Sequence, residues 1–373
     1  MKITIAMDSF KGTLSARESC ECIADALPDG FFATLVPLSD GGEGICDVLS
    51  AQSGFYYVNC PSADVYGNAR TGRYLVSNDS AFIESALSCG ITQTVTGRQS
   101  PLITTTCGVG LEILHALKNG CKSIYVFVGG TAVNDLGTGM ARALGYRFTD
   151  ANGNETCLSG GSVGDTAFID ARNAVPIPTD VHIYAPTDVT NPLCGENGAS
   201  MVYSMQKGAS REEAVMLDDA LRHMAALIKQ TLKANVSKIP GSGAGGGLGG
   251  GLIAFCGASV TSGFDVISKL LNLEKAIIES DAVITGEGKT DMQTAFGKLP
   301  ARVAQLAAKH GKPCYIISGR VTEDVKAHGM PGVTAFYEAA GNSIADAEAF
   351  SHAYTYLKKS AQRMLLDIKA ERK

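Results

Sequence analysis

Carboxylate and lysine side chains gather directly after short apolar runs in this chain, which is the pattern of a site built on loops at strand ends. In residues 281–300 the apolar run stops at Glu287, and a polar turn then carries Lys289 and Asp291 before apolar spacing beyond Lys298 predicts a helix. Such carboxylates can hold a metal or take a proton, and such lysines can meet phosphate. Open α/β sheets bind their ligands in loops of this kind, so this stretch is a candidate site.

The same pattern occurs twice at the beginning of the chain. Residues 2–7 read as a strand that leads to Asp8 and Lys11, and Ser15 with Glu18 forms the capping box of a helix. Residues 32–37 read as a second strand, followed by Asp40 in a glycine-rich loop. Two successive strand–loop–helix units with carboxylates therefore point to the same site.

Two further strand ends carry an Asp and an Asn each. Residues 123–128 precede Asn134 and Asp135, and residues 182–185 precede Asp188 and Asn191. This chemistry suits metal coordination or the orientation of a hydroxyl, although Asx-rich turns also arise for structural reasons. Lys207 follows in a polar turn before a helix expected at residues 211–234.

Residues 240–251 form a glycine-rich run with 8 glycines between positions 241 and 251. We predict a loop whose backbone amides approach phosphates, with a flexible linker as the alternative. The run contains G-x-G-x-x-G spacing, but no clear strand precedes it and no acidic residue is placed for a ribose, so a dinucleotide site is disfavoured. The phosphate-binding glycines would be Gly243, Gly245, Gly246 and Gly247.

Composition sets the class of protein. The 373 residues suggest two domains or one large one, and 45% hydrophobic residues suffice for a buried core. A net charge of -5 without a basic run argues against nucleic acid as a partner. The chain shows no signal peptide and no long apolar run, so we expect a cytoplasmic protein without membrane partners; it could form a homo-oligomer.

The order of the elements predicts an α/β fold of two domains. A doubly wound sheet needs about five strands; residues 1–54 supply two, and residues 280–373 supply three more. We therefore expect a Rossmann-like or flavodoxin-like parallel sheet built from both chain ends, with residues 55–279 inserted as a mixed α/β domain. This arrangement places several candidates at the carboxyl ends of one sheet, facing a cleft whose other wall carries Asn134 and Asp188: Asp8, Lys11, Asp40, Glu287 and Asp291.

Seven motifs resemble those of the bacterial glycerate kinases of the glyoxylate and galactarate pathways. They are DSFKGTLSA from Asp8, SDGGEG from Ser39, GGTAVNDLGTGM from Gly129, TDVTNPLCGENGAS from Thr187, QKGAS from Gln206, PGSGAGGGLGGGL from Pro240 and GEGKTDMQTAFGK from Gly286. The resemblance spans nearly the whole chain and implies ATP-dependent phosphorylation of D-glycerate, with 2-phosphoglycerate as the product of related enzymes. It also implies a two-domain α/β fold without a Walker A motif. Leu136, Lys289 and Ser39 depart from the residues common in the family, which are Gly, Arg and Ala.

Residue chemistry, not the resemblance, suggests the individual roles. Phosphoryl transfer needs positioned phosphates, neutralised charge and an aligned hydroxyl, and Mg²⁺ would supply the neutralisation. Asp188 and Asp291 are the candidates for Mg²⁺ ligand or base, and Lys11 is the third catalytic candidate. The remaining candidates would bind glycerate or ATP: Asp8, Asp40, Asn134, Asp135, Asn191, Lys207, Glu287, Lys298 and the four glycines.

Three alternative functions remain open at this point. A kinase for another small hydroxy acid would share every motif, as would a glycerate kinase that forms 3-phosphoglycerate. An NAD-dependent oxidoreductase would use the glycine-rich run as its dinucleotide loop, and this reading is the weakest, because the strand and the acidic residue are missing.

Overall fold

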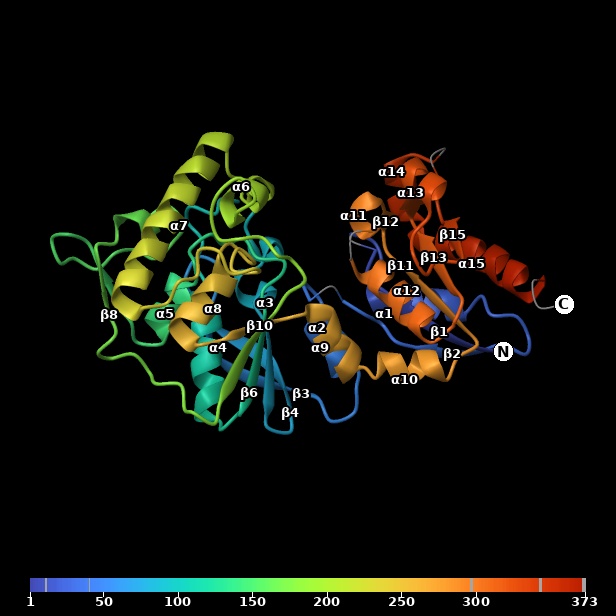
Figure 1. Cartoon of the computed structure of the whole chain (residues 1–373), viewed down its shortest axis with the longest axis horizontal. Helices are drawn as coiled ribbons and strands as arrows, with labels where there is room; N and C mark the ends of the chain where they lie inside the picture. The colour runs from blue at the N-terminus through green and yellow to red at the C-terminus, as the bar shows by residue number, and fades with distance from the viewer. Residues whose placement is uncertain (11, 40, 296–297, 342–343, 371–373) are drawn as a thin grey trace. The chain divides into compact units, whose positions relative to one another are not determined.

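The computed structural model describes residues 1–10, 12–39, 41–295, 298–341 and 344–370 of the chain. The chain divides into two compact units, which are coloured along the sequence in Figure 1. Unit 1 consists of Met1–Asp40 and Phe264–Lys373, and unit 2 of Gly41–Gly263. The sequence suggested divisions after residue 54 and before residue 280, whereas the compact units divide after residues 40 and 263.

Unit 1 contains a five-stranded parallel sheet that draws on both ends of the chain. The strand order is β15-β13-β11-β1-β2, with bounds Ala335–Glu338, Cys314–Ser318, Ala282–Gly286, Lys2–Met7 and Phe32–Leu35. β1 pairs in parallel with β11 so that Met7 lies opposite Gly286. The α/β class and the parallel sheet expected from the sequence are thus confirmed.

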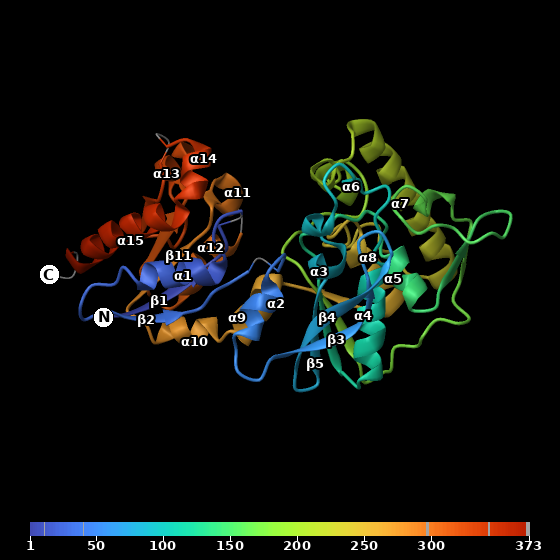
Figure 2. The same ribbon diagram turned by 180° about the vertical axis from the view of Figure 1, so that it is seen from behind.

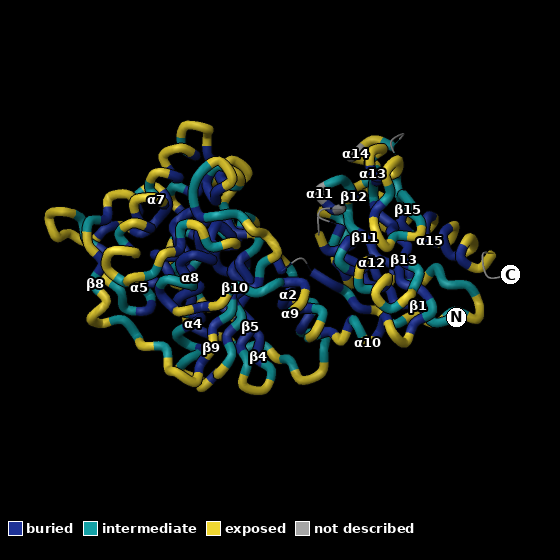
Figure 3. The backbone as a smooth tube through the Cα atoms, viewed as in Figure 1, coloured by how far each residue is buried: buried dark blue, intermediate teal, exposed yellow. Residues whose placement is uncertain are grey.

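Helices cover both faces of this sheet, as Figure 2 shows from behind. Alternate residues of β1 point to opposite faces. Ile3 and Ile5 lie in one core cluster with residues of α1 (Ala16–Ala24) and α15 (Ala353–Ala370). On the other face Thr4 donates a hydrogen bond to the Ala276 carbonyl of α10 (Leu273–Ile278) at 2.9 Å, and α12 (Leu299–Lys309) contacts β11. The central strands are buried, dark blue in Figure 3, as doubly covered parallel strands must be.

Local hydrogen bonds change two expected elements of unit 1. One helix was expected at residues 344–368, but α14 (Asp346–Ser351) ends at Ser351, and α15 begins only after His352. Ser351 donates from Oγ to the Glu348 carbonyl at 3.1 Å, a side-chain bond that competes with helix continuation. The polar turn expected at Lys289 instead forms the short strand β12 (Lys289–Thr290), which pairs with β14 (Arg320–Val321). Two further helices of this unit are α11 (Met292–Ala295) and α13 (Glu323–His328).

Unit 2 contains a six-stranded mixed sheet. The order is β10-β9-β6-β5-β4-β3, with bounds Ser259–Thr261, His182–Pro186, Ser123–Phe127, Ser80–Glu84, Ala69–Ser77 and Tyr56–Ala63. β3, β4 and β5 are antiparallel neighbours, whereas β5, β6, β9 and β10 run parallel. The carboxyl ends of these four parallel strands therefore lie along one edge.

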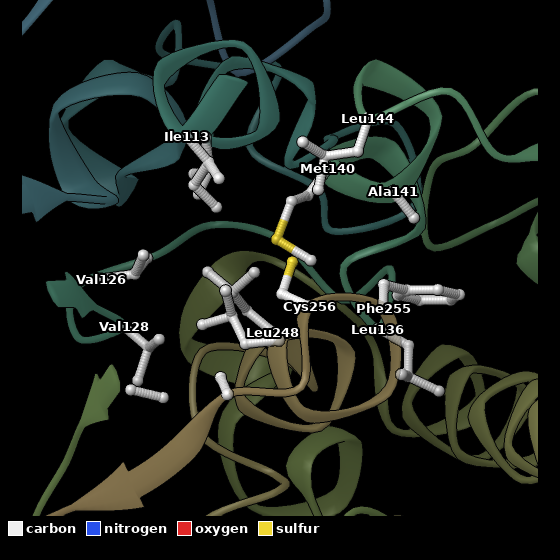
Figure 4. Packing of buried hydrophobic residues seen from close by; sticks show 14 of the residues in the cluster. Ile113, Val126, Val128, Leu136, Met140, Ala141, Leu144, Leu248, Phe255 and Cys256 are labelled. Atoms are coloured by element: carbon white, nitrogen blue, oxygen red, sulfur yellow. The ribbon is translucent and has the colours of Figure 1, made fainter. Parts of the chain in front are cut away.

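Apolar side chains of helices and strands share the core of unit 2. Figure 4 shows Ile113 of α4 (Cys107–Lys118), Val126 of β6, Met140 of α5 (Thr138–Ala143) and Leu248 of α8 (Leu248–Cys256) in this cluster. Further helices of this unit are α3 (Ala86–Cys89), α6 (Ala199–Tyr203) and α7 (Arg211–Leu232). Single 3-10 turns occur at Ile91–Gln93, Val163–Asp165 and Met205–Lys207, and the last of these is η3. A separate pair of short strands, β7 (Arg147–Thr149) and β8 (Phe168–Asp170), is antiparallel.

Two groups of contacts explain where the units divide. Glu84 at the end of β5 accepts hydrogen bonds from the amides of Gly44 (2.8 Å) and Cys46 (2.9 Å), so α2 (Ile45–Ser50) belongs to unit 2. The Thr4 bond to α10, described above, and an ion pair between Arg302 and Asp265 of α9 (Gly263–Leu270) at 2.9 Å hold α9 and α10 in unit 1. Over the part of the chain that is described, no helix is long and apolar enough to cross a membrane.

A buried carboxyl group, Glu112, lies between α4 and the β3–β4 hairpin. It is 1% exposed, and its Oε1 accepts a hydrogen bond from Ser62 Oγ at 2.8 Å. Within the described residues its Oε2 has no hydrogen-bond partner. Burial raises the pKa of Glu112 to about 8, and the Ser62 hydrogen bond and the charge of Arg70 oppose this rise. In the folded protein Glu112 is therefore mostly a neutral carboxylic acid below this pH.

Replacement of Glu112 by Gln is expected to weaken the pH dependence of stability. In the wild type, the stabilisation associated with neutral Glu112 is complete below the usual pKa of 4.5 and is lost as the pH rises to about 8, because the unfolded state ionises first. Gln is neutral at every pH and removes this contribution. Urea unfolding of both proteins between these pH values measures the difference, and parallel curves for the two proteins would contradict a neutral Glu112.

Candidate functional site

Asp8 and Glu287 lie side by side at the carboxyl end of the unit 1 sheet. Each follows one member of the register pair Met7–Gly286, and the amide of Asp8 donates to the Gly286 carbonyl at 2.9 Å. Asp8 is 6% exposed, and its Oδ1 accepts a hydrogen bond from the Ser9 amide at 2.7 Å. The strand pairing thus brings carboxylates from the two ends of the chain to one edge.

Thr294 forms hydrogen bonds to both Glu287 and Asp291 at the same edge of the unit 1 sheet. Its hydroxyl donates to Glu287 Oε1 at 2.6 Å, and its amide donates to Asp291 Oδ1 at 3.3 Å. Both carboxylates are half-buried, and Lys298 is exposed at the N-cap of α12. Unit 1 therefore assembles Asp8, Glu287 and Asp291, while Lys11 and Asp40 lie outside the described residues.

The loop after β9 in unit 2 carries Asp188 and Asn191. Asp188 is exposed, and its Oδ1 accepts a hydrogen bond from Ser262 Oγ at 2.9 Å. Asn191 is half-buried: its Nδ2 donates to the Asn197 carbonyl at 2.8 Å and its Oδ1 accepts from the Tyr203 hydroxyl at 2.7 Å. Asp188 thus presents a carboxylate at the surface, whereas both ends of the Asn191 amide bind within the protein.

The loop after β6 buries Asn134 and Asp135 completely. Asp135 accepts hydrogen bonds from the Thr106 amide and hydroxyl, both at 2.8 Å, and from the amides of Gly137 and Gly139. Burial raises the pKa of Asp135, and these bonds oppose the rise. The contacts give Asp135 a structural role in its turn; its binding of a ligand stays a prediction.

Lys207 is buried against the same loop. It is 5% exposed, and its Nζ donates to the Val133 carbonyl at 2.8 Å. Burial lowers the pKa of Lys207 to about 8, while the nearby Cys89 and Asp135 oppose this change. Asn134, next to Val133, donates from Nδ2 to Ser200 Oγ at 2.9 Å.

The glycine-rich run packs against the backbone of both loops. A Cβ on Gly243 would lie 2.3 Å from the Pro192 carbonyl oxygen, one on Gly245 2.6 Å from that of Val128, and one on Gly246 1.9 Å from that of Val133. Only glycine permits such close approach. The run follows α7 and a turn, and α8 begins inside it at Leu248, so the strand–loop–helix order of a dinucleotide loop is absent here. Phosphate binding by these glycines and Gly247 stays a prediction.

The whole chain is similar to proteins of one known family. The model of the glycerate kinase family matches residues 3–369. The chain belongs to the glycerate kinase family. It is 39% identical to the glycerate 2-kinase of Escherichia coli K12 over 98% of this chain and 97% of that protein. It is 37% identical to the glycerate kinase of Bacillus cereus ATCC 10987, again over 98% and 97% of the two chains.

A solved structure shows the same fold. The crystal structure of a protein assigned as glycerate kinase 2 from Salmonella typhimurium LT2 superimposes with a TM-score of 0.83 at 36% identity. The match covers 100% of this chain and 99% of that chain. The family assignment and the α/β fold, both expected from the motifs, are thus confirmed over the whole length.

Leu136 is the departure from the family motifs that the structure explains best. Its φ is +53°, a left-handed conformation that costs about 1–2 kcal/mol for a residue with a Cβ. The side chain is fully buried in the unit 2 core, seen in Figure 4, and burying a leucine is worth about 1.5–3 kcal/mol. The Leu136 amide also donates to the Gly246 carbonyl at 3.3 Å. Burial therefore offsets the backbone cost at this turn.

Each unit has a candidate carboxylate of the kind that Mg²⁺ accepts together with a nucleotide. Among the residues described, no group of three or more Asp, Glu, His or Cys side chains is arranged to hold a metal ion by itself. Mg²⁺ is usually held by one or two carboxylates together with substrate phosphates. Asp188 is such a carboxylate in unit 2, and Asp291 is one in unit 1. The binding of Mg²⁺ by either residue stays a prediction.

Several residues that hold the candidate side chains were not among the candidates chosen from residue chemistry. Ser262, Thr294, Ser200, Tyr203 and Thr106 bind the candidate side chains through hydroxyl groups. Hydroxyl residues are common in turns and caps, so their types alone do not reveal a distant partner. Only the spacing of Asp291 and Thr294, typical of a cap, could have suggested one of these contacts.

Proposed function

We propose that this protein transfers the γ-phosphoryl group of ATP to D-glycerate and forms 2-phosphoglycerate. The observation that carries this proposal is the 39% identity, along 98% of the chain, to a protein named glycerate 2-kinase. The loops that carry the candidate groups follow strand ends, where α/β proteins place ligands. A cytoplasmic location, where ATP is available, is part of the proposal.

The candidate groups have distinct roles in this proposal. The exposed carboxylate of Asp188 and the half-buried carboxylate of Asp291 are the candidates to accept the hydroxyl proton or to hold Mg²⁺. When bound, Mg²⁺ would neutralise charge on the phosphate oxygens. Asp8 and Glu287 would assist at the carboxyl edge of the unit 1 sheet, and Asp40 would assist as well. The exposed Lys298, together with Lys11, would bind the phosphates or the glycerate carboxylate.

The proposal predicts ADP formation from ATP with D-glycerate in the presence of Mg²⁺, and 2-phosphoglycerate as the product. A coupled ADP assay on the purified protein measures turnover, and NMR of the product identifies the phosphorylated carbon. A panel of small hydroxy acids run in parallel should give lower kcat/KM values. Absence of ADP formation at millimolar D-glycerate would refute the activity, whereas a 3-phosphoglycerate product would refute only the position of the phosphate.

A further inference from the structure

One short helical segment of unit 2 touches both candidate loops. This segment, α6 with η3, runs from Ala199 to Lys207 and is called here the α6–η3 segment. Its residues Ser200, Tyr203 and Lys207 are spaced by three and four positions, the spacing of one helix face. All three direct a polar group to the loops after β6 and β9.

Ser200 and Lys207 hold two consecutive residues of the loop after β6. Ser200 Oγ accepts the hydrogen bond of Asn134 Nδ2 at 2.9 Å, and both residues are fully buried. Lys207 Nζ donates to the Val133 carbonyl at 2.8 Å. A Cβ on Gly246 would lie 1.9 Å from the same carbonyl oxygen, so the α6–η3 segment and the glycine-rich run both contact Val133.

Tyr203 holds the loop after β9. Its hydroxyl donates to Asn191 Oδ1 at 2.7 Å, and the Asn191 carbonyl accepts a hydrogen bond from the Gly243 amide at 3.1 Å. The α6–η3 segment thereby links both loops and the glycine-rich run, although its residues are 66 to 74 positions from Asn134 and Val133 in the sequence.

The hydrogen bond to Ser200 holds one end of the Asn134 amide. Because Nδ2 donates to Ser200, Oδ1 is directed elsewhere, and within the described residues this buried oxygen has no hydrogen-bond partner. A buried acceptor without a donor costs free energy, and a ligand that supplies the donor would remove this cost. An amide oxygen only accepts: the hydroxyls of a hydroxy acid can donate to it, and the ionised phosphate oxygens of ATP cannot.

We propose that Ser200, Tyr203 and Lys207 are positioning residues that hold Asn134 and Asn191 for the hydroxy acid, with Asn134 Oδ1 accepting a hydrogen bond from one of its hydroxyls. This inference rests on the proposed function. In this inference Lys207 supports the loop after β6. Ser200 and Tyr203 do not contact the substrate themselves and contribute to its recognition by orienting the two asparagines.

The test is a pair of double-mutant cycles on the full-length protein. Ser200→Ala is expected to lower kcat/KM for D-glycerate about 3- to 10-fold, mainly by raising its KM, as the loss of one hydrogen bond would. Asn134→Ala should cost more, about 10- to 100-fold, and the double variant should be no worse than Asn134→Ala alone, because Ser200 acts through Asn134. The KM for ATP should stay at the wild-type value.

The second cycle pairs Tyr203→Phe with Asn191→Ala at less buried positions, so it remains informative if Asn134→Ala does not fold. The same non-additivity is expected. Val202→Ala and Met205→Ala are matched controls on the exposed side of the segment, 41% and 54% exposed, and should keep wild-type kinetics. Thermal unfolding of every variant separates loss of fold from loss of positioning.

Three results would overturn the inference. Additive losses in both cycles would show a merely structural role for the segment. A raised KM for ATP, together with lost discrimination against 2′-deoxy-ATP, would assign Asn134 to the ribose. Wild-type kinetics in both Ser200→Ala and Tyr203→Phe would refute positioning altogether. Failure of the wild-type protein to phosphorylate glycerate would instead overturn the proposed function, and this inference with it.

Discussion

Replacement of Asp188 by Asn is expected to lower kcat for glycerate phosphorylation by about 10²–10⁴-fold, the usual contribution of base catalysis. Asn keeps the shape of the side chain and can still accept a hydrogen bond from Ser262 Oγ, which lies 2.9 Å from Asp188 Oδ1. The charge is therefore what the substitution removes. Asp291→Asn should lower kcat within the same range, and its Oδ1 can still accept from the Thr294 amide at 3.3 Å.

The chain offers a matched control for Asp188 at the opposite end of strand β9. Asp180 lies just before β9, at the amino end, and forms an exposed ion pair with Lys122 at 2.5 Å. Such surface pairs contribute little to stability, so Asp180→Asn should leave both kcat and folding at wild-type values. Steady-state kinetics with D-glycerate and ATP decide the matter. If Asp188→Asn and Asp291→Asn both turn over like the wild type, the base or metal ligand lies elsewhere, and Asp8 is the next candidate.

Replacement of Gly246 by Ala is expected to destabilise unit 2 severely. The φ of Gly246 is +69°, and a Cβ would lie 1.9 Å from the Val133 carbonyl oxygen and 2.7 Å from the Val133 carbonyl carbon. These are backbone atoms of a buried loop that Lys207 also holds, so the clash cannot be relieved by rotation of a side chain. Overpacking typically costs about 1–3 kcal/mol or more, in addition to about 1–2 kcal/mol for the left-handed backbone.

Gly257, the C-cap of α8, isolates the backbone contribution. Its φ is +65°, nearly that of Gly246, but a Cβ there would have no neighbour within 4 Å. Gly257→Ala should therefore cost only about 1–2 kcal/mol. Denaturant unfolding of both variants gives the difference in free energy of unfolding. Equal stabilities would mean that the loop at Val133 adapts freely, contrary to the tight packing described above.

The sequence by itself determined the local elements and the family. Its apolar periodicity located β1, β11 and the helices around them, and the capping box of Ser15 with Glu18 is present at the start of α1. Polar residues after strand ends identified Asp8, Glu287 and Asp188 as loop residues, which they are. Strand and helix periodicity, caps and loop positions depend on residues a few positions apart, so they can be predicted from the sequence. The two-residue strands β12 and β14 were not predictable, because each exists only through pairing with a distant segment.

Only the tertiary structure decided what the individual side chains do. Asp135 binds Thr106, Asn134 binds Ser200, and Lys207 binds Val133, contacts that span 29, 66 and 74 positions. The glycine-rich run suggested phosphate binding. Its glycines are also needed because the run packs so closely against the backbone of the loops after β6 and β9 that a Cβ would not fit. Burial and hydrogen-bond partners depend on which distant segments pack together. Residue type therefore limits the chemistry available to a side chain, and packing selects the role that it performs.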